Sequence, residues 1–127
     1  MLITAAIFAV IAAVIHLYIF VLESLRWNAP GTMKIFGIAT PQDAAATQAM
    51  AYNQGFYNLF LAVSAVLGVV LLGAGSRVAG LTLMSFATAS MFLAAAVLLA
   101  SNRHMVRPAM IQGGPAGVAL LFTLLGA

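Results

Sequence analysis

The sequence AYNQGFYNLFLAVSAVLGVVLLG, from Ala51 to Gly73, places a cluster of polar side chains directly before a long apolar run. Within two helical turns it carries Tyr52, Asn53, Gln54, Tyr57 and Asn58. Asn58 follows Gln54 by four residues, so a helix presents both amides on one face. Polar groups at the edge of a bilayer are costly unless other helices or water satisfy them. We therefore predict a membrane-spanning helix whose polar end is a candidate binding site.

The composition of the whole chain assigns it to the membrane. Of the 127 residues, 65% are hydrophobic and 6% are charged, and the mean hydropathy is +1.14. A soluble chain of this length could not bury so much apolar surface. The absence of cysteine excludes disulfides and thiol chemistry. A net charge of +3 from dispersed basic residues argues against a nucleic-acid partner. The expected partner is the lipid bilayer.

Four apolar segments are each long enough to cross a hydrocarbon core, which takes about 20 helical residues. We predict spans at residues 2-23, 49-73, 78-100 and 108-126, with residues 24-48 as the one long polar loop. The first span lacks a preceding basic residue and ends in LESLRW, so we interpret it as retained rather than as a cleaved signal peptide. The predicted fold is a single all-α domain, 1-127, an integral membrane four-helix bundle.

Two of these helices have unusual boundaries. The motif TPQD, residues 40-43, predicts a helix start, with a threonine cap, proline in the first turn and an aspartate near the positive end of the helix dipole. A helix from there to Gly73 would be roughly 48 Å long, longer than a bilayer core. It either projects from the membrane, which we favour, or breaks near Gly55. In the last span, Gly113-Gly114-Pro115 weakens the helix, which predicts a bent or unwound turn from Ala109 to Gly114 that contains Gln112.

The basic residues predict the topology. Loops after the first and third spans lie on the same side and hold Arg26, Lys34, Arg103 and Arg107, whereas only Arg77 lies in the other loop. The positive-inside rule then puts both termini on the outer side and loop 24-48 in the cytoplasm, with the bacterial inner membrane as the expected location. Counting residues along the spans brings their polar groups to the cytoplasmic end.

The first span directs two ionisable side chains into the bundle. Ala5, Ala9 and Ala12 or Ala13 form a small-residue stripe that permits close helix contact. Positions 9, 16 and 23 are spaced by sevens, so His16 and Glu23 extend this stripe, with His16 about two turns deeper. The two side chains lie roughly 10 Å apart along one helix, which does not suit a metal site, and we expect no metal and no cofactor.

The polar residues at this end form the predicted site. The expected ligand-binding residues are His16, Glu23, Tyr52, Asn53, Gln54, Tyr57, Asn58, Arg107 and Gln112, of which His16 and Glu23 are also the candidates for catalysis. We expect Gln54 and Asn58 to face His16 or Glu23 rather than lipid. Structural interpretations stay open for His16 and Glu23. Glu23 would be structural if it pairs with Arg26 or Arg107, and His16 would be a structural pin if it bonds to Asn58 or Tyr57.

Three segments carry a resemblance to a known family: HLYIFVLESLRW (His16 to Trp27), NQGFYNLFLA (Asn53 to Ala62) and RPAMIQGGPAGVALL (Arg107 to Leu121). In them the chain resembles the small four-span membrane proteins of domain-of-unknown-function family thirteen-zero-four. The resemblance implies a compact four-helix membrane bundle and no particular activity. It also implies that the family's recurrent polar residues map onto His16, Glu23, Asn53, Gln54, Asn58 and Gln112.

Three functions are compatible with these features. In the first, the protein binds or transports a small molecule at a proton-exchanging polar site, as a homodimer because four short spans enclose little volume. In the second, it is a membrane-embedded acid/base enzyme, of isomerase, cyclase or hydrolase type, that acts on an apolar lipid-like substrate. In the third, it is a structural membrane subunit without chemistry of its own.

Overall fold

The computed structural model describes the whole chain, Met1–Ala127, and contains only helices. In order these are α1 (Leu2–Phe20), the π-helical turn η1 (Val21–Leu25), α2 (Pro30–Phe36), α3 (Pro41–Gly73), α4 (Arg77–Ser101), the 3-10 turn η2 (Arg103–Met105) and α5 (Val106–Gly126). Four helical segments are long and apolar enough to cross a membrane: Leu2–Leu25, Pro41–Gly73, Arg77–Ser101 and Arg103–Gly126. The chain is therefore an all-α, multi-pass membrane protein, and the predicted fold class is confirmed in these terms.

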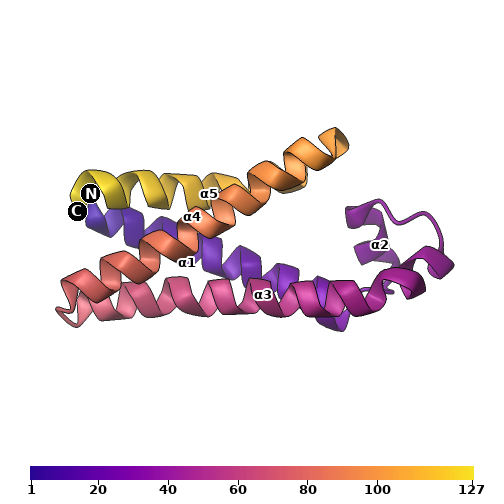
Figure 1. Cartoon of the computed structure of the whole chain (residues 1–127), viewed down its shortest axis with the longest axis horizontal. Coiled ribbons are helices and arrows are strands. Elements are labelled where there is room, and N and C mark those ends of the chain that lie inside the picture. Colours follow the sequence, from indigo (N-terminus) through magenta and orange to yellow (C-terminus); the bar gives the residue numbers. More distant parts are fainter.

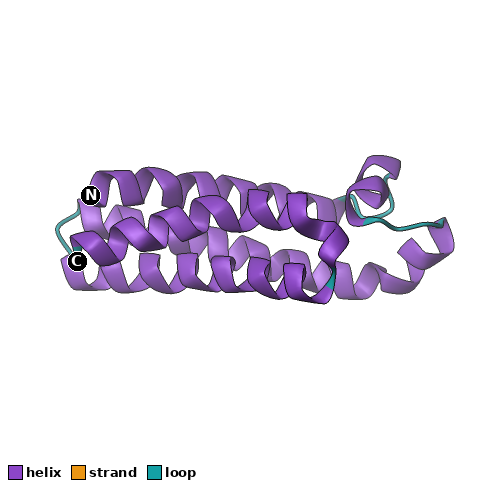
Figure 2. Ribbon diagram, turned by 90° about the horizontal axis from the view of Figure 1, so that it is seen from above, coloured by secondary structure: helices purple, strands orange, loops and turns teal.

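The four long helices pack in the cyclic order α1, α3, α4, α5, so that each lies beside two others. Both chain termini and the turn between α3 and α4 lie at one end of the bundle, and α2 lies at the other (Figure 1). The long helices run side by side in the view from above (Figure 2). Toward its C-terminal end α4 diverges from α3 (Figure 1).

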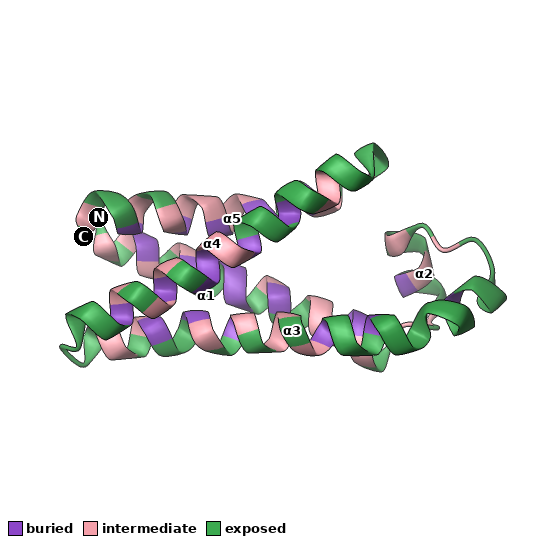
Figure 3. Cartoon of the chain, in the orientation of Figure 1, coloured by how far each residue is buried: buried purple, intermediate pink, exposed green.

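The core consists mainly of alanine. One buried cluster contains Ala12, Ala13, Ala62, Ala65, Ala87, Met91 and Ala116, and a second contains Ala5, Ala9, Met84 and Ala119. Many large apolar side chains face outward instead, and the buried positions follow the facing sides of the helices (Figure 3). Lipid provides no hydrophobic driving force between helices, so small residues that let backbones approach are the expected core. The predicted alanine stripe of the first span is confirmed.

Glycine makes the contact between α3 and α4 especially close. A Cβ atom added to Gly68 would lie 2.6 Å from the backbone nitrogen of Met84. A Cβ atom added to Gly80 would lie 2.5 Å from the backbone nitrogen of Leu72. Because these neighbours are backbone atoms, they cannot give way without moving a helix. The two glycines therefore set the distance between α3 and α4.

The long second span begins where the sequence indicated. Thr40 caps α3, accepting a hydrogen bond from the Asp43 backbone N–H at 3.1 Å, and Pro41 is the first helical residue. The helix continues through Gly55, so the alternative of a break there is wrong. Its first ten residues, Pro41–Met50, which we call the stem, are exposed except for Ala44. Projection of the stem from the membrane stays a prediction.

The last span differs from the expectation. Helix α5 continues through Gly113, Gly114 and Pro115, so the unwound turn predicted there is wrong. Proline removes one backbone hydrogen bond from a helix. Gly113 nevertheless seats α5 directly against α4, because an added Cβ atom would lie 2.5 Å from Cβ of Ala95. We infer that this packing supports the helix where the proline weakens it.

We predict that Gly68→Ala destabilises the bundle by about 1 to 3 kcal/mol, because the new methyl group overpacks a contact between backbones. Gly114→Ala is the matched control, since nothing lies within 4 Å of a Cβ atom added there. Unfolding of the purified protein in mixed micelles, followed by circular dichroism, measures both variants. Equal stability of the two variants would contradict the proposed close contact.

Candidate functional site

The acidic residue Glu23 lies in the π-helical turn η1, which interrupts the regular winding at the end of the first span. Such turns are rare and are frequent at functional sites. The Glu23 side chain is only 8% exposed. It accepts a hydrogen bond from the side-chain amide of Asn58 on α3, with 2.7 Å between Nδ2 and Oε2. This bond joins the first two spans through the predicted site.

A second contact fixes the same turn against α3. The Ser24 hydroxyl donates a hydrogen bond to the backbone carbonyl of Tyr52 at 2.7 Å. Ser24 also lies directly against Gly55, where any Cβ atom would overlap its hydroxyl. Phe20 and Phe56 stack edge to face nearby, with 5.1 Å between ring centroids. Sequence reasoning missed Ser24 and the role of Gly55, although a glycine within a helix was a signal of close approach.

His16 is the deepest polar residue of the predicted site and is 0% exposed. Its Nδ1 atom lies 2.8 Å from the backbone carbonyl oxygen of Ala12. Its Nε2 atom is the one buried side-chain nitrogen or oxygen in the chain without a hydrogen-bond partner. The bond to Asn58 or Tyr57 required by the structural interpretation is not formed, because Asn58 binds Glu23 and Tyr57 is 63% exposed.

The remaining predicted residues lie outside this group. Tyr52, Asn53, Gln54 and Tyr57 are exposed. None of their side chains forms a hydrogen bond, and the expectation that Gln54 faces His16 or Glu23 is not met. Gln54 lies between Tyr52 and Gly55, both of which contact Ser24, but its own side chain is on the exposed side of α3. Gln112 is half-buried on α5, also without a hydrogen bond.

Glu23 has no cationic partner. Arg26 and Arg107 are both exposed, and the structure contains no ion pair to Glu23, whose side chain is bonded to Asn58 instead. Arg26 follows the π-helical turn where the chain leaves the helix, and Arg107 lies in the first turn of α5. Neither Arg26 nor Arg107 therefore pairs with Glu23. Nowhere do three His, Cys, Asp or Glu residues group as a metal site would require.

Beyond the core, at the polar end of the bundle, Trp27 packs between α2 and the stem. The Trp27 indole N–H is shared between the backbone carbonyl of Ala44 and the hydroxyl of Thr47, both at 3.1 Å. Its ring packs on Phe36 of α2, with 5.1 Å between centroids. From the sequence alone, Trp27 fits an anchor at the membrane interface, where tryptophan is enriched. The structure adds that it holds α2 and the stem together.

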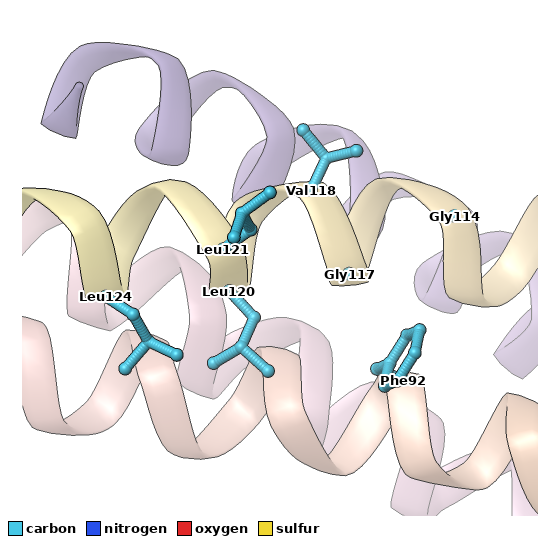
Figure 4. A pocket seen from close by; sticks show the side chains of 7 residues that line it. All are labelled: Phe92, Gly114, Gly117, Val118, Leu120, Leu121 and Leu124. Carbon is cyan, nitrogen blue, oxygen red and sulfur yellow. The ribbon is translucent and has the colours of Figure 1, made fainter.

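Two grooves on the outer surface lie apart from these polar groups. One, of about 410 Å³, lies between α4 and α5, where Phe92 faces Gly114 and Gly117 (Figure 4). The other, of about 420 Å³, lies between α1 and α3 and is lined by hydrophobic residues alone, among them Leu17 and Leu59. Neither groove includes Glu23, Asn58 or His16. Their apolar walls suit contact with lipid.

Fold and site together define a class: a small multi-pass membrane bundle with an acidic residue and a histidine buried between its helices. Within that class, the family described as Protein of unknown function (DUF1304) matches residues 10–124. The chain belongs to this family, and the resemblance predicted from its sequence is confirmed. Comparisons with curated proteins and with solved structures give no match.

We predict that Asn58→Leu destabilises the protein by about 1 to 3 kcal/mol, because it leaves the buried Glu23 carboxyl group without a donor. Glu23→Gln should be close to wild type, since its amide oxygen still accepts from Asn58. Gln48→Leu is the control, because it also replaces an amide of α3 by leucine, but at an exposed position. Denaturant unfolding in micelles measures all three. If Asn58→Leu and Gln48→Leu had the same free energy of unfolding, the hydrogen bond between Asn58 and Glu23 would contribute nothing to stability.

Proposed function

We propose that this protein binds or transports a small molecule at the end of the bundle that carries Glu23 and Asn58. The observation that supports the proposal most strongly is the burial of Glu23 against a neutral amide with no cation beside it. Intramembrane ionisable residues of this kind often mark substrate or proton pathways. A carboxyl group held by a neutral donor can take up a proton or bind a ligand without first breaking an ion pair.

The proposal includes an orientation. Both termini lie on the outer side of a bacterial inner membrane, and loop 24-48 lies in the cytoplasm. In support, α2 and the connection between α4 and α5 lie at the end opposite the termini, and residues 24-48 and 102-107 hold four of the five basic residues. The site then opens toward the cytoplasm. A homodimer would enlarge the enclosed volume, since one copy packs its interior with alanine.

A second candidate is an acid/base enzyme that acts on an apolar, lipid-like substrate. The buried, unpartnered Nε2 atom of His16 favours it, because a bare imidazole nitrogen can act as a general base. Glu23 would supply the acid. The two candidates differ in what leaves the protein: a carrier releases its ligand unchanged, and an enzyme releases a product of different mass or connectivity.

We predict that a reporter fused after Ala127 is active only on the outer side, and that one inserted at Gly31 is active only in the cytoplasm. Paired alkaline phosphatase and green fluorescent protein fusions measure this, because each is active on one side. A cytoplasmic C-terminus combined with an external Gly31 insertion would reverse the proposed orientation.

We predict that protein extracted in mild detergent retains a small molecule, which mass spectrometry of the intact complex detects and identifies. Glu23→Gln keeps the bond to Asn58 but removes the ionisable group, so occupancy should fall about tenfold, which corresponds to about 1.4 kcal/mol of binding free energy. Gln48→Leu is the control and should retain full occupancy. Equal occupancy in wild type and Glu23→Gln would remove this carboxyl group from the binding site.

A further inference from the structure

The imidazole of His16 has one used and one unused nitrogen. A backbone carbonyl can only accept a hydrogen bond, so the 2.8 Å contact with Ala12 requires a proton on Nδ1. In the neutral ring Nε2 is then a bare acceptor. This atom is fully buried and has no partner. An unsatisfied buried acceptor costs about 1 to 3 kcal/mol, so the fold gains if a donor reaches it.

Apart from Thr32 of α2, the buried side-chain donors that could serve His16 are already hydrogen-bonded. The amide of Asn58 donates to Glu23 at 2.7 Å and to the backbone carbonyl of Gln54 at 3.3 Å. The hydroxyls of Thr88 and Thr123 each donate to the carbonyl four residues earlier, at 2.8 and 2.7 Å. These side chains cannot serve His16 without giving up an existing bond.

Gln112 is the internal donor that has to be tested. Antiparallel α1 and α5 bring Leu2 to Gly126 and Ala12 to the cluster that contains Ala116. One turn further along each helix, the same register places His16 level with Gln112. The Gln112 side chain makes no hydrogen bond and is only half-buried, and it does not reach Nε2 in the structure.

The surroundings of His16 restrict the charge of a guest, that is, of any molecule that binds at Nε2. Ala12, to which the ring is bonded, belongs to a buried cluster of alanines and one methionine. Glu23 is the only buried acidic or basic side chain besides His16 itself, and it lies about two turns away. An anion would face the Nε2 lone pair, and a cation would have no counter-charge at this depth. A neutral hydrogen-bond donor fits.

We propose that His16 Nε2 accepts a hydrogen bond from the O–H group of a neutral guest, either water or the hydroxyl end of a membrane-soluble alcohol. The guest enters from the Glu23 end, where α4 diverges from α3 (Figure 1) and the glycine contacts of Gly68 and Gly80 are absent. The inference rests on the proposed function and names the chemistry of its ligand. Glu23 and Asn58 then line the entry, and His16 holds the polar group of the guest.

Nitrogen-15 NMR of the protein in deuterated lipid bilayers tests this directly. The chain has two histidines, so His104→Gln leaves His16 as the only labelled histidine, with its ring intact. Spectra are recorded in water alone, with added 1-dodecanol, and with added dodecane, which has the same chain without a hydroxyl. Gln112→Leu removes the internal donor in a parallel sample.

The expected spectrum has a protonated Nδ1 and an unprotonated Nε2 shifted by an accepted hydrogen bond, also in Gln112→Leu. A correlation from Nε2 to water protons identifies water as the guest. A saturable shift with 1-dodecanol but not with dodecane identifies an alcohol. The proposal is overturned if Nε2 has the shift of a free acceptor in every sample, if Nε2 is the protonated nitrogen, or if its hydrogen bond disappears in Gln112→Leu.

The binding function and the role of His16 as an acceptor are tested independently. If no molecule is retained on extraction but Nε2 is hydrogen-bonded to water, the proposed binding function fails and the assignment of His16 as an acceptor stands. If a molecule is retained in a Glu23-dependent way while Nε2 stays free, the site binds its ligand without His16. The inference about His16 is then wrong.

Discussion

Close approach of helix backbones through small residues is the constraint on which this structure depends. In lipid, helices gain little from burying apolar side chains, so dispersion contacts and hydrogen bonds between closely packed backbones must hold them together. Gly68 and Gly80 set the distance between α3 and α4, and Gly55 does the same for α3 and the π-helical turn. The last contact brings Glu23 within reach of Asn58. The site is therefore a consequence of the packing.

The same constraint explains why so few polar groups are buried. A core of alanine leaves little room for side chains that need partners, and those buried between the four long helices are hydrogen-bonded to a neighbouring helix or to their own backbone. His16 Nε2 is the exception. Its bond to Ala12 also limits its chemistry, because the carbonyl cannot take the Nδ1 proton onward. His16 is thus better suited to accept a donor than to pass protons through the bundle.

Much of the fold could be predicted, because length and hydropathy identify membrane helices and because Thr40, Pro41 and Asp43 mark the start of α3. The alanine stripe of α1 placed His16 and Glu23 inside. The sequence also predicts that Asn58 faces His16 or Glu23, and it bonds to Glu23, but the exposure of Gln54 and the unpartnered Nε2 atom of His16 could not be predicted. These details depend on the π-helical turn that carries Glu23 and on the orientation of α3, which leaves the Gln54 side chain exposed. Neither feature has a signal in residue spacing.

The central claim is that Glu23 and Asn58 meet between the first two spans of the protein in its bilayer. Glu23 is the only glutamate in the chain, so its carboxyl carbon can be labelled with carbon-13 uniquely, together with nitrogen-15 in asparagine side chains. Solid-state NMR then measures the dipolar coupling between them. We predict a strong coupling, as a 2.7 Å hydrogen bond requires, that disappears in Asn58→Leu. A carboxyl group without coupling to any asparagine amide would contradict the account.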